Sequence, residues 1–291
     1  MIDLHMHTKY SDGTDSLTEI LHNCEDKGLS VISITDHNNC DAYFEMEKLN
    51  ITDYFSGKII VGIELNTKAE GVPIEILGYN IDYKKVNELA KKLYLSPDKR
   101  NEIEFKRLVK KCIDYGIVLD EDVLETFDKN DFASVAIHKN ITNHEENKSK
   151  INEKSWESNI DFYREYMSNP NTPLYVEMDD MVPDLNTVIN IVKEAGGLVF
   201  IPHIYEYRDN TPKVLNYILE NGRLDGIECY YTTFTKQQHE YILNLTNEKG
   251  LFISGGSDYH GKRKPNVHLG VGKGNLSIPE EIQIPWAKYL N

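Results

Sequence analysis

The chain has 291 residues, of which 40% are hydrophobic and 27% charged, and its formal net charge is −15. This composition is typical of a globular domain, and the excess of acidic residues disfavours binding to long duplex nucleic acid or to an anionic membrane surface. No apolar run approaches the ~20 residues needed to span a bilayer. The residues of types that bind metals begin at His5, which leaves no room for a cleavable targeting segment before them. We therefore expect a cytoplasmic protein without a membrane or targeting segment.

Seven short apolar, β-branched runs predict strands that alternate with helix-like segments. The predicted strands are residues 2–7, 31–35, 59–64, 74–79, 198–202, 226–229 and 251–255. Helical periodicity covers residues 17–27, 185–195 and 236–249. Because strand–helix alternation is typical of a mostly parallel sheet, we predict an α/β fold, specifically a distorted seven-stranded (β/α)7 barrel.

The stretch from residue 83 to residue 173 interrupts this alternation. It contains helical patterns at 99–115 and 121–126 and a polar tract at 143–159. We predict a barrel formed by residues 1–82 and 174–272, an inserted helical subdomain at 83–173, and a C-terminal tail at 273–291 that packs over the outside of the barrel.

The first predicted strand carries His5 and His7, which point to the same face because side chains alternate along a strand. Two histidines at this spacing reach one divalent ion, although such a pair alone is equally explained by hydrogen-bonded histidines at a strand end. Asp258 and His260 repeat the spacing near the other end of the sequence, and Asp12 follows the first pair closely. Together these residues indicate a metal site.

Other metal-type residues stand at the ends of predicted strands, where a barrel gathers its active residues. These are His37, Glu64 and His203. A buried glutamate without a cation is costly, so Glu64 is expected to bind metal or to pair with a charged group. Asp36 is explained equally well as a metal contact or as the cap of the following helix.

Five motifs carry most of these residues: Asp3–Thr8 with Ser11–Gly13, Ile34–His37, Gly62–Glu64, Pro202–His203 and Gly256–Gly261. In order, they resemble the motifs of the PHP (polymerase and histidinol phosphatase) family of metal-dependent phosphoesterases, whose fold is a distorted seven-stranded barrel. The resemblance extends from residue 2 to about residue 272. Further stretches, Ile76–Tyr79, Asp225–Tyr231 and Lys264–Pro265, are similar to the branch that acts on nucleotides or short oligonucleotides.

The resemblance implies a set of ligands for each ion. A first ion would be held by His5, His7, Glu64 and Asp258, a second by Asp12, His37 and His260, and a third by Glu64 and His203. The branch usually has a histidine where this chain has Glu75. We expect Glu75 to bind the third ion and to favour manganese or magnesium, the alternative being a weak or empty third site. The expected cofactors are therefore two or three divalent ions of manganese, zinc or iron, with magnesium as a further candidate.

The resemblance also implies hydrolysis of a small phosphorylated substrate, a phosphomonoester or short phosphodiester, by a metal-activated hydroxide. Asp12, His37 and His260 are the candidates for moving the leaving-group proton. The candidates for binding the substrate phosphate are Arg100, Arg208 and Arg263, each explained equally well as a solvated surface residue.

Three alternatives remain open: a non-catalytic metal- or nucleotide-binding module, a metal-dependent hydrolase of a C–N bond, and a histidinol-phosphatase-like enzyme. The first is motivated by Glu75 and by the stretch Phe132–His138, where the branch usually has an Arg-Pro-His-like sequence. His138 is out of register with it, and we expect a packing histidine on a helix. Tyr230 and Tyr231 are expected either to stack on a base or sugar or to pack in the protein.

Overall fold

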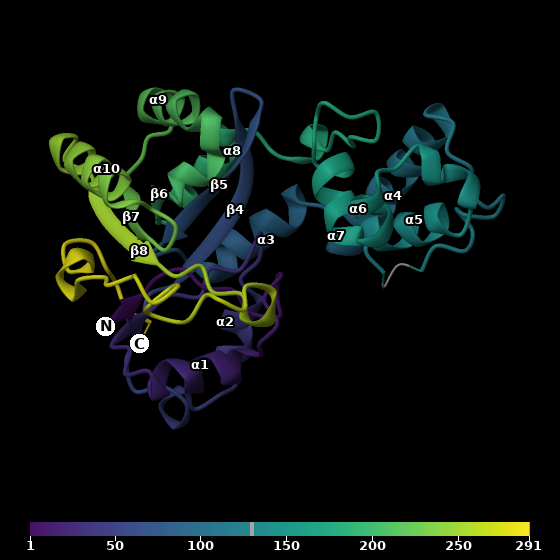
Figure 1. Ribbon diagram of the computed structural model, residues 1–291. Coiled ribbons are helices and arrows are strands. Elements are labelled where there is room, and N and C mark those ends of the chain that lie inside the picture. Colours follow the sequence, from purple (N-terminus) through teal and green to yellow (C-terminus); the bar gives the residue numbers. More distant parts are fainter. Residues whose placement is uncertain (129–130, 291) are drawn as a thin grey trace. The chain divides into compact units, whose positions relative to one another are not determined.

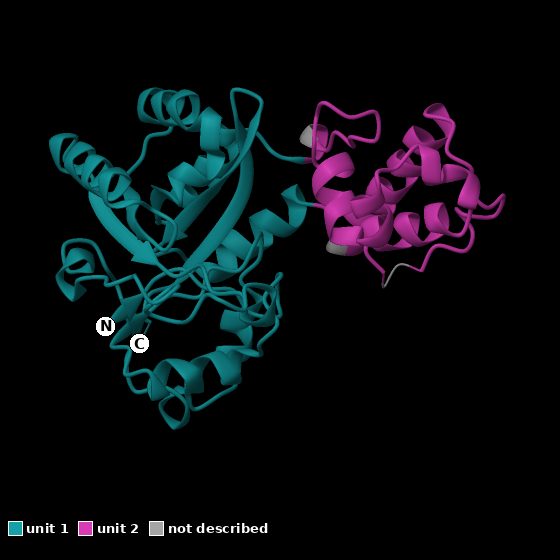
Figure 2. Cartoon of the chain, in the orientation of Figure 1, with its two compact units in different colours: residues 1–94, 182–291 teal, residues 95–181 magenta. Residues whose placement is uncertain are grey.

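The computed structural model describes residues 1–128 and 131–290. The chain forms two compact units (Figure 2). Unit 1 comprises Met1–Tyr94 and Val182–Asn291, and unit 2 comprises Leu95–Met181. The helix α3 (Tyr83–Leu93), which falls in the segment predicted as an insertion, lies in unit 1.

The strands of unit 1 form two sheets, and Figure 1 shows helices around the outside of them. The first contains β1 (Ile2–Asp3), β2 (Val31–Ile32) and β3 (Lys58–Ile59), all parallel. The second has the order β4 (Gly62–Ala69), β5 (Val72–Tyr79), β6 (Leu198–Ile201), β7 (Gly226–Tyr231) and β8 (Phe252–Gly256). In this second sheet β5 is antiparallel to both neighbours, whereas β6, β7 and β8 are parallel.

The predicted α/β class is confirmed, but a closed seven-stranded barrel is not. The isolated bridges Met6–Tyr259 and His37–Glu64 join the two sheets, which remain separate sheets in their strand pairing. The predicted strand 59–64 is divided between β3 and β4, and β4 continues to Ala69. The two-residue turn after Ala69 explains the difference, because Glu70 and Gly71 both have positive φ and reverse the chain into the antiparallel β5.

The helices of unit 1 bury apolar faces against the outer side of the strands. Besides α3 they are α1 (Leu17–Asp26), α2 (Asp41–Met46), α8 (Leu185–Glu194), α9 (Thr211–Asn221) and α10 (Lys236–Glu248). α1 begins at a capping box in which Ser16 and Glu19 satisfy each other's backbone N–H groups. Leu21, Val188 and Ile242 belong to one core with outward strand residues such as Ile63.

The inner side of the strands forms a second core. Ile2, Leu77, Tyr79 and Phe200 pack there with Trp286 of the C-terminal tail. The Trp286 ring centroid lies 5.2 Å from that of Tyr79 and 5.0 Å from that of Phe200. The tail, which includes η7 (Glu280–Gln283), is therefore part of this inner core, and the prediction that it packs over the outside is wrong.

Unit 2 is helical and has its own core. Its α-helices are α4 (Pro97–Asp114), α5 (Ala133–Thr142), α6 (Glu153–Glu157) and α7 (Asn159–Phe162). The core contains Phe105, Leu108, Ile137 and Phe162. The predicted helix at 121–126 is wrong, because the chain forms turns there. His138 lies on α5 as expected, with Nε2 2.8 Å from the Ser155 carbonyl oxygen and its ring against Phe162.

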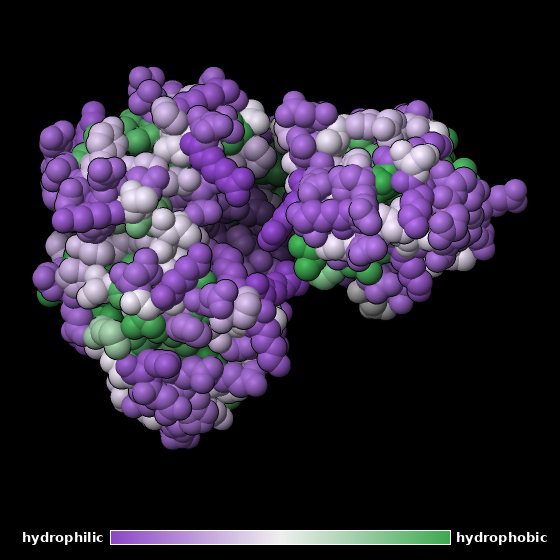
Figure 3. Space-filling view, viewed as in Figure 1, coloured by the Kyte–Doolittle hydropathy of each residue, from purple (hydrophilic) through white to green (hydrophobic). Residues whose placement is uncertain are grey.

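Shorter helical turns connect these elements. They are η1 (Ile51–Asp53), η2 (Glu145–Ser149), η3 (Tyr163–Met167), η4 (Asp179–Met181), η5 (Ile204–Asn210) and η6 (Gly261–Arg263). Among the described residues, no helix combines the length and apolar character required to cross a lipid bilayer. Hydrophilic residues cover most of the molecular face seen in Figure 3.

Candidate metal centre

Unit 1 contains a cavity of about 390 Å³ lined mainly by polar side chains. The lining residues are Asp12, His37, Glu64, Pro73, Glu75, His203, Glu206, Tyr207, Tyr231, Asp258, His260 and Lys264. They come from β4, β5 and β7 and from segments that follow β1, β2, β6 and β8. The sheets therefore bring together residues from both halves of the sequence, including seven of those predicted as metal ligands.

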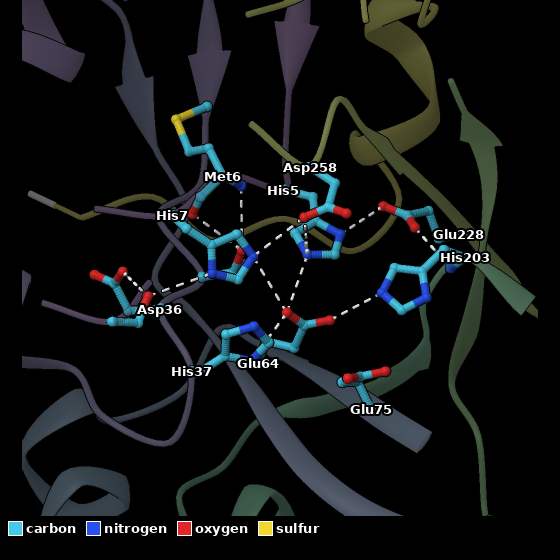
Figure 4. Close-up of polar contacts among 12 residues, drawn as sticks. His5, Met6, His7, Asp36, His37, Glu64, Glu75, His203, Glu228 and Asp258 are labelled. Carbon is cyan, nitrogen blue, oxygen red and sulfur yellow. Dashed lines mark hydrogen bonds and ion pairs between the residues drawn. The ribbon is translucent and has the colours of Figure 1, made fainter. Parts of the chain in front are cut away.

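His5 and His7 meet Glu64 and Asp258 in the interior of unit 1 (Figure 4). The Nε2 atoms of His5 and His7 lie 3.3 and 3.2 Å from the same Glu64 atom, Oε2. They also lie 3.6 and 3.4 Å from Asp258 Oδ1. Since both imidazoles are fully buried, four side chains converge on a region shielded from solvent.

Asp12 joins a second group, with three histidines. Its Oδ1 atom lies 3.1 Å from His260 Nε2 and 3.7 Å from both His37 Nε2 and His7 Nδ1. The second nitrogen of His37, Nδ1, lies 3.3 Å from Glu64 Oε2. Because the Asp12 side chain is 38% exposed, this group reaches from the buried carboxylates to solvent.

Glu64, Glu75 and His203 form a third group. Glu64 Oε1 lies 3.1 Å from His203 Nε2. Glu75 stands on the neighbouring strand, where the pairing of β4 with β5 places it diagonally from Glu64 on the same face. The three residues offer ligand atoms within 4.8 Å of one another. The Tyr207 hydroxyl donates to Glu75 Oε2 at 3.2 Å and accepts from the Glu75 N–H at 3.0 Å, so it fixes this strand position from both sides.

The three groups fit divalent cations. Among the described residues, His5 Nε2, His7 Nε2, His37 Nδ1 and Asp12 Oδ1 are buried and make no hydrogen bond. A tetrahedral ion at about 2.0–2.2 Å from each ligand separates the ligand atoms by about 3.3–3.6 Å. The four distances that His5 and His7 make to the carboxylates, 3.2–3.6 Å, match this separation.

The electrostatics of the cluster also favour bound cations. Burial lowers the pKa of His5, but Glu64, Glu228 and Asp258 outweigh burial and hold this pKa well above its usual value. At His7, Asp258 and Glu64 outweigh burial and raise the pKa to about 9, whereas burial lowers the pKa of His37 to about 4. Burial and the nearby Glu64 raise the pKa of Glu75. A cation that replaces protons in this cluster relieves these conflicts, so metal binding would release protons.

Two buried aspartates hold the loops that carry the cluster. Asp36 accepts hydrogen bonds from the Thr8 N–H and hydroxyl, both at 2.7 Å, and from the Ser11 hydroxyl at 2.6 Å. Asp36 therefore fixes the loop between His7 and Asp12. It does not cap the following helix α2, whose N-cap position is taken by Cys40 without a side-chain hydrogen bond. Asp3 accepts from the Ser257 N–H at 2.9 Å and from its hydroxyl at 2.6 Å, which fixes the chain just before Asp258.

Three further residues, to which the sequence analysis gave no metal-site role, contact the cluster. Glu228 Oε1 lies 3.0 Å from His5 Nδ1, and Glu228 Oε2 accepts the His203 N–H at 2.8 Å. The Tyr231 hydroxyl donates to Asp258 Oδ2 at 2.7 Å, and Lys264 Nζ donates to the same oxygen. All three lie in Asp225–Tyr231 or Lys264–Pro265, the stretches that resemble the nucleotide branch of the family. Glu228 could have been found from sequence, because it is an acidic residue inside the apolar run of β7.

The backbone is strained or tightly packed at three points of the site. His203 and Asp258 have φ of 27° and 58°, values that non-glycine residues rarely adopt and that occur at functional sites. At Gly256, an added Cβ would lie 2.2 Å from His5 Cβ and 2.5 Å from the His5 nitrogen. Glycine at this position therefore allows β8 to pass directly against His5, which lies in the segment that follows β1 rather than on the longer strand predicted at residues 2–7.

None of the three arginines proposed to bind phosphate is among the residues given above for the cavity lining. Arg208 and Arg263 are exposed residues of η5 and η6 and do not belong to the cavity lining given above. Arg100 lies on α4 of unit 2. Of the two tyrosines considered for stacking, Tyr231 lines the cavity, whereas Tyr230 packs against His239 with ring centroids 4.7 Å apart.

Comparison with known proteins places these residues in a wider context. A family model described as the PHP domain matches residues 3–169, more than half of the chain. A 5'-3' exoribonuclease from Haemophilus influenzae is 25% identical over 290 residues, which cover 99% of this chain and 98% of that protein. A phosphoribosyl 1,2-cyclic phosphate 1,2-diphosphodiesterase from Eggerthella lenta is 24% identical over 271 residues, which cover 92% of this chain and 97% of that protein.

A solved structure shares the fold. It is that of a predicted metal-dependent phosphoesterase from Bifidobacterium adolescentis, with a TM-score of 0.67 and 22% sequence identity. The match covers 97% of this chain and 95% of the other, so the shared fold includes nearly the whole length of both.

Proposed function

Because the chain belongs to the PHP family of metal-dependent phosphoesterases and is therefore a hydrolase, we propose that it hydrolyses small phosphomonoesters or short phosphodiesters of nucleotides. The observation that carries this proposal is the convergence of buried histidine nitrogens without hydrogen bonds on the carboxylates of Glu64 and Asp258, beside an open cavity. The bridges between the two sheets support a distorted barrel whose inner face holds this cluster.

The geometry supports three ion positions that share ligands. His5, His7, Glu64 and Asp258 would hold the most buried ion, and Asp12, His37 and His260 the one nearest solvent. Glu64 and His203 would hold the third with Glu75 in the place usually taken by histidine. Since this last group contains two carboxylates and one imidazole, manganese or magnesium suits it better than zinc does.

Bound divalent ions would supply a nucleophilic water at neutral pH and neutralise charge on the phosphoryl group. We propose that Asp12 handles the leaving-group proton, a role that the partial exposure of its side chain supports. Its Oδ1 atom faces His260 and His37, which leaves Oδ2 to hold a proton between substrate and solvent. Tyr231 and Glu228 orient Asp258 and His5, and the fully buried imidazoles keep bulk water away from the inner ligands.

The size of the cavity restricts the substrate. A volume of about 390 Å³ is near the lower end of the ~300–1,000 Å³ range of small-molecule sites, so one nucleotide or one sugar phosphate can enter. The two relatives described above are named as an exoribonuclease and as a phosphodiesterase of a phosphoribosyl cyclic phosphate. We infer that this chain acts on a ribose phosphate ester, either as a free nucleotide or at the end of a short oligonucleotide.

The test is a substrate panel with protein stripped of metal and reloaded separately with manganese, zinc, iron or magnesium. The panel contains nucleoside 5'- and 3'-monophosphates, a cyclic ribose phosphate, 5'-phosphorylated di- and trinucleotides, histidinol phosphate and a set of amides. Phosphate release, new phosphate ends and amine release are measured in parallel. We expect metal-dependent cleavage of the ribose phosphate esters and no release of amine.

His7→Ala is the diagnostic variant and His22→Ala its control. His7 belongs to two of the ligand groups, whereas His22 is exposed on α1 against Tyr54. His7→Ala should lose bound metal and activity together, and His22→Ala should keep both. Folded, metal-loaded protein that releases amine but no phosphate would instead establish a hydrolase of C–N bonds, and tight nucleotide binding without turnover would establish a binding module.

A further inference from the structure

We propose that Lys264 binds the phosphoryl group of the substrate and restricts the enzyme to esters with a single phosphate at the cleavage site. This inference rests on the proposed phosphoesterase function. Among the described residues that line the cavity, Lys264 alone carries a lysine or arginine charge, whereas five carry carboxylates. The carboxylates are those of Asp12, Glu64, Glu75, Glu206 and Asp258.

The contacts of Lys264 direct its ammonium group toward the metal ligands. Lys264 Nζ donates to Asp258 Oδ2, the oxygen that also accepts the Tyr231 hydroxyl at 2.7 Å. The other oxygen, Asp258 Oδ1, faces His5 and His7. One oxygen of Asp258 thus faces the metal cluster and the other contacts Lys264. The positive charge of Lys264 is therefore separated from the proposed buried ion only by the Asp258 carboxylate.

The Lys264 side chain remains free to bind a second anion. An ammonium group has three donors, and the structure shows one of them used, by Asp258. The side chain is 39% exposed and lines the open part of the cavity, so its other donors can reach a ligand there. Its backbone is fixed from both sides, because the Lys264 N–H donates to Gly261 and the Lys264 carbonyl accepts from Val267.

The charge of the cavity explains why this lysine matters and suggests the limit on substrates. Five carboxylates and one ammonium give the lining a formal charge of −4 when the histidines are neutral. Two divalent ions would bring it to about zero and three to about +2, which balances one phosphate dianion. A triphosphate carries more negative charge than this lining can balance, so a single phosphate is the favoured ligand.

The first experiment separates phosphate binding from turnover. Binding of inorganic phosphate to manganese-loaded protein is measured by calorimetry for wild type, Lys264→Gln, Lys264→Arg and the control Lys249→Gln, which changes an exposed lysine at the end of α10. We expect Lys264→Gln to weaken phosphate binding about 10–100-fold, the cost of a lost hydrogen bond to a charged group. Lys264→Arg should restore part of it, and Lys249→Gln should match wild type.

Kinetics and metal analysis complete the test. In Lys264→Gln, the KM for a nucleoside monophosphate should rise by about the same factor as the phosphate affinity falls, and the metal content should not change. The wild-type enzyme should prefer a nucleoside monophosphate to the triphosphate. Unchanged phosphate affinity, or metal loss in both Lys264 variants, would overturn the proposal, since the lysine would then act only on Asp258. If wild type binds phosphate through Lys264 but cleaves no phosphate ester, the proposed function fails and the binding role stands.

Discussion

On the inner side of the second sheet, one end carries charged side chains and the other carries apolar ones. On β5, Glu75 faces the cavity with Glu64 and His203, whereas Leu77 and Tyr79, a few residues further along the same strand, belong to the apolar core with Trp286. The first end buries charged groups, which opposes folding unless cations are bound, and the second removes apolar surface from water, which favours folding. Substitutions at the two ends should therefore have separable effects on activity and stability.

The largest effect is expected for Glu64→Gln, which removes the carboxylate that the first and third ligand groups share and that also contacts His37 of the second. Metal affinity and kcat/KM should each fall by more than about a thousandfold, beyond the 10–100-fold typical of residues that only orient ligands. Metal analysis and kinetics check this, and a metal affinity within tenfold of wild type would contradict it.

The converse experiment is Phe200→Ala in the apolar end. Phe200 is fully buried beside Tyr79 and Trp286, so its truncation should lower the free energy of unfolding by about 3–5 kcal/mol. Denaturant unfolding measures this loss. The folded variant should bind as much metal as wild type at low temperature, and reduced metal content there would show that the two ends are coupled.

Adding metal should stabilise only through the polar end. At a free manganese concentration of 100 times Kd, one bound ion should raise the free energy of unfolding by about 2.7 kcal/mol. The same addition should leave Glu64→Gln nearly unchanged and should stabilise Phe200→Ala as much as wild type. Thermal unfolding with and without manganese provides the measurement.

A smaller effect is expected for Glu228→Gln. Glu228 contacts His5 Nδ1 and the His203 N–H rather than the proposed ions, so the variant should lose about 10–100-fold in metal affinity. Competition with a fluorescent chelator measures that affinity. A loss as large as that of Glu64→Gln would indicate that Glu228 binds an ion directly.

The smallest effect concerns the choice of metal. Glu75→His should shift the relative affinity from manganese toward zinc by about tenfold, because imidazole is the softer ligand. Metal content after dialysis against equal concentrations of both ions reports this shift. If the ratio does not change, Glu75 takes no part in binding and its contact with Tyr207 is structural.

The ligand residues could be predicted from sequence because each stands in a short local pattern. His5 and His7 share a face by alternation alone, and Asp258 and His260 repeat that spacing. The partners behind them could not be read in this way: His5 and Glu228 are 223 residues apart, and their contact depends on the completed sheet. The same applies to Lys264, which faces the cavity while its neighbour Arg263 is exposed, a difference set by the turn after η6.

The fold was predicted at the level of its class and less well in its strands. Glu64 was expected to end a strand, but β4 continues to Ala69 and returns as β5. The hairpin turn is formed by Glu70 and Gly71. A glycine preceded by a charged residue predicts such a turn only weakly, compared with an Asn-Gly pair. The hairpin is the reason that Glu75 lies beside Glu64.

The hydrogen bonds from Ser257 to Asp3 have a consequence for biosynthesis. The two residues are 254 positions apart. At about 5–20 residues per second, the ribosome therefore adds Ser257 roughly 13–50 s after Asp3. During this interval His5 and His7 exist without Asp258, and the segment that carries them lacks its hydrogen bonds to β8 and to the residues that follow it. Loading of the proposed metal centre would therefore be a late event, because its set of ligands is complete only when almost the whole chain has been made.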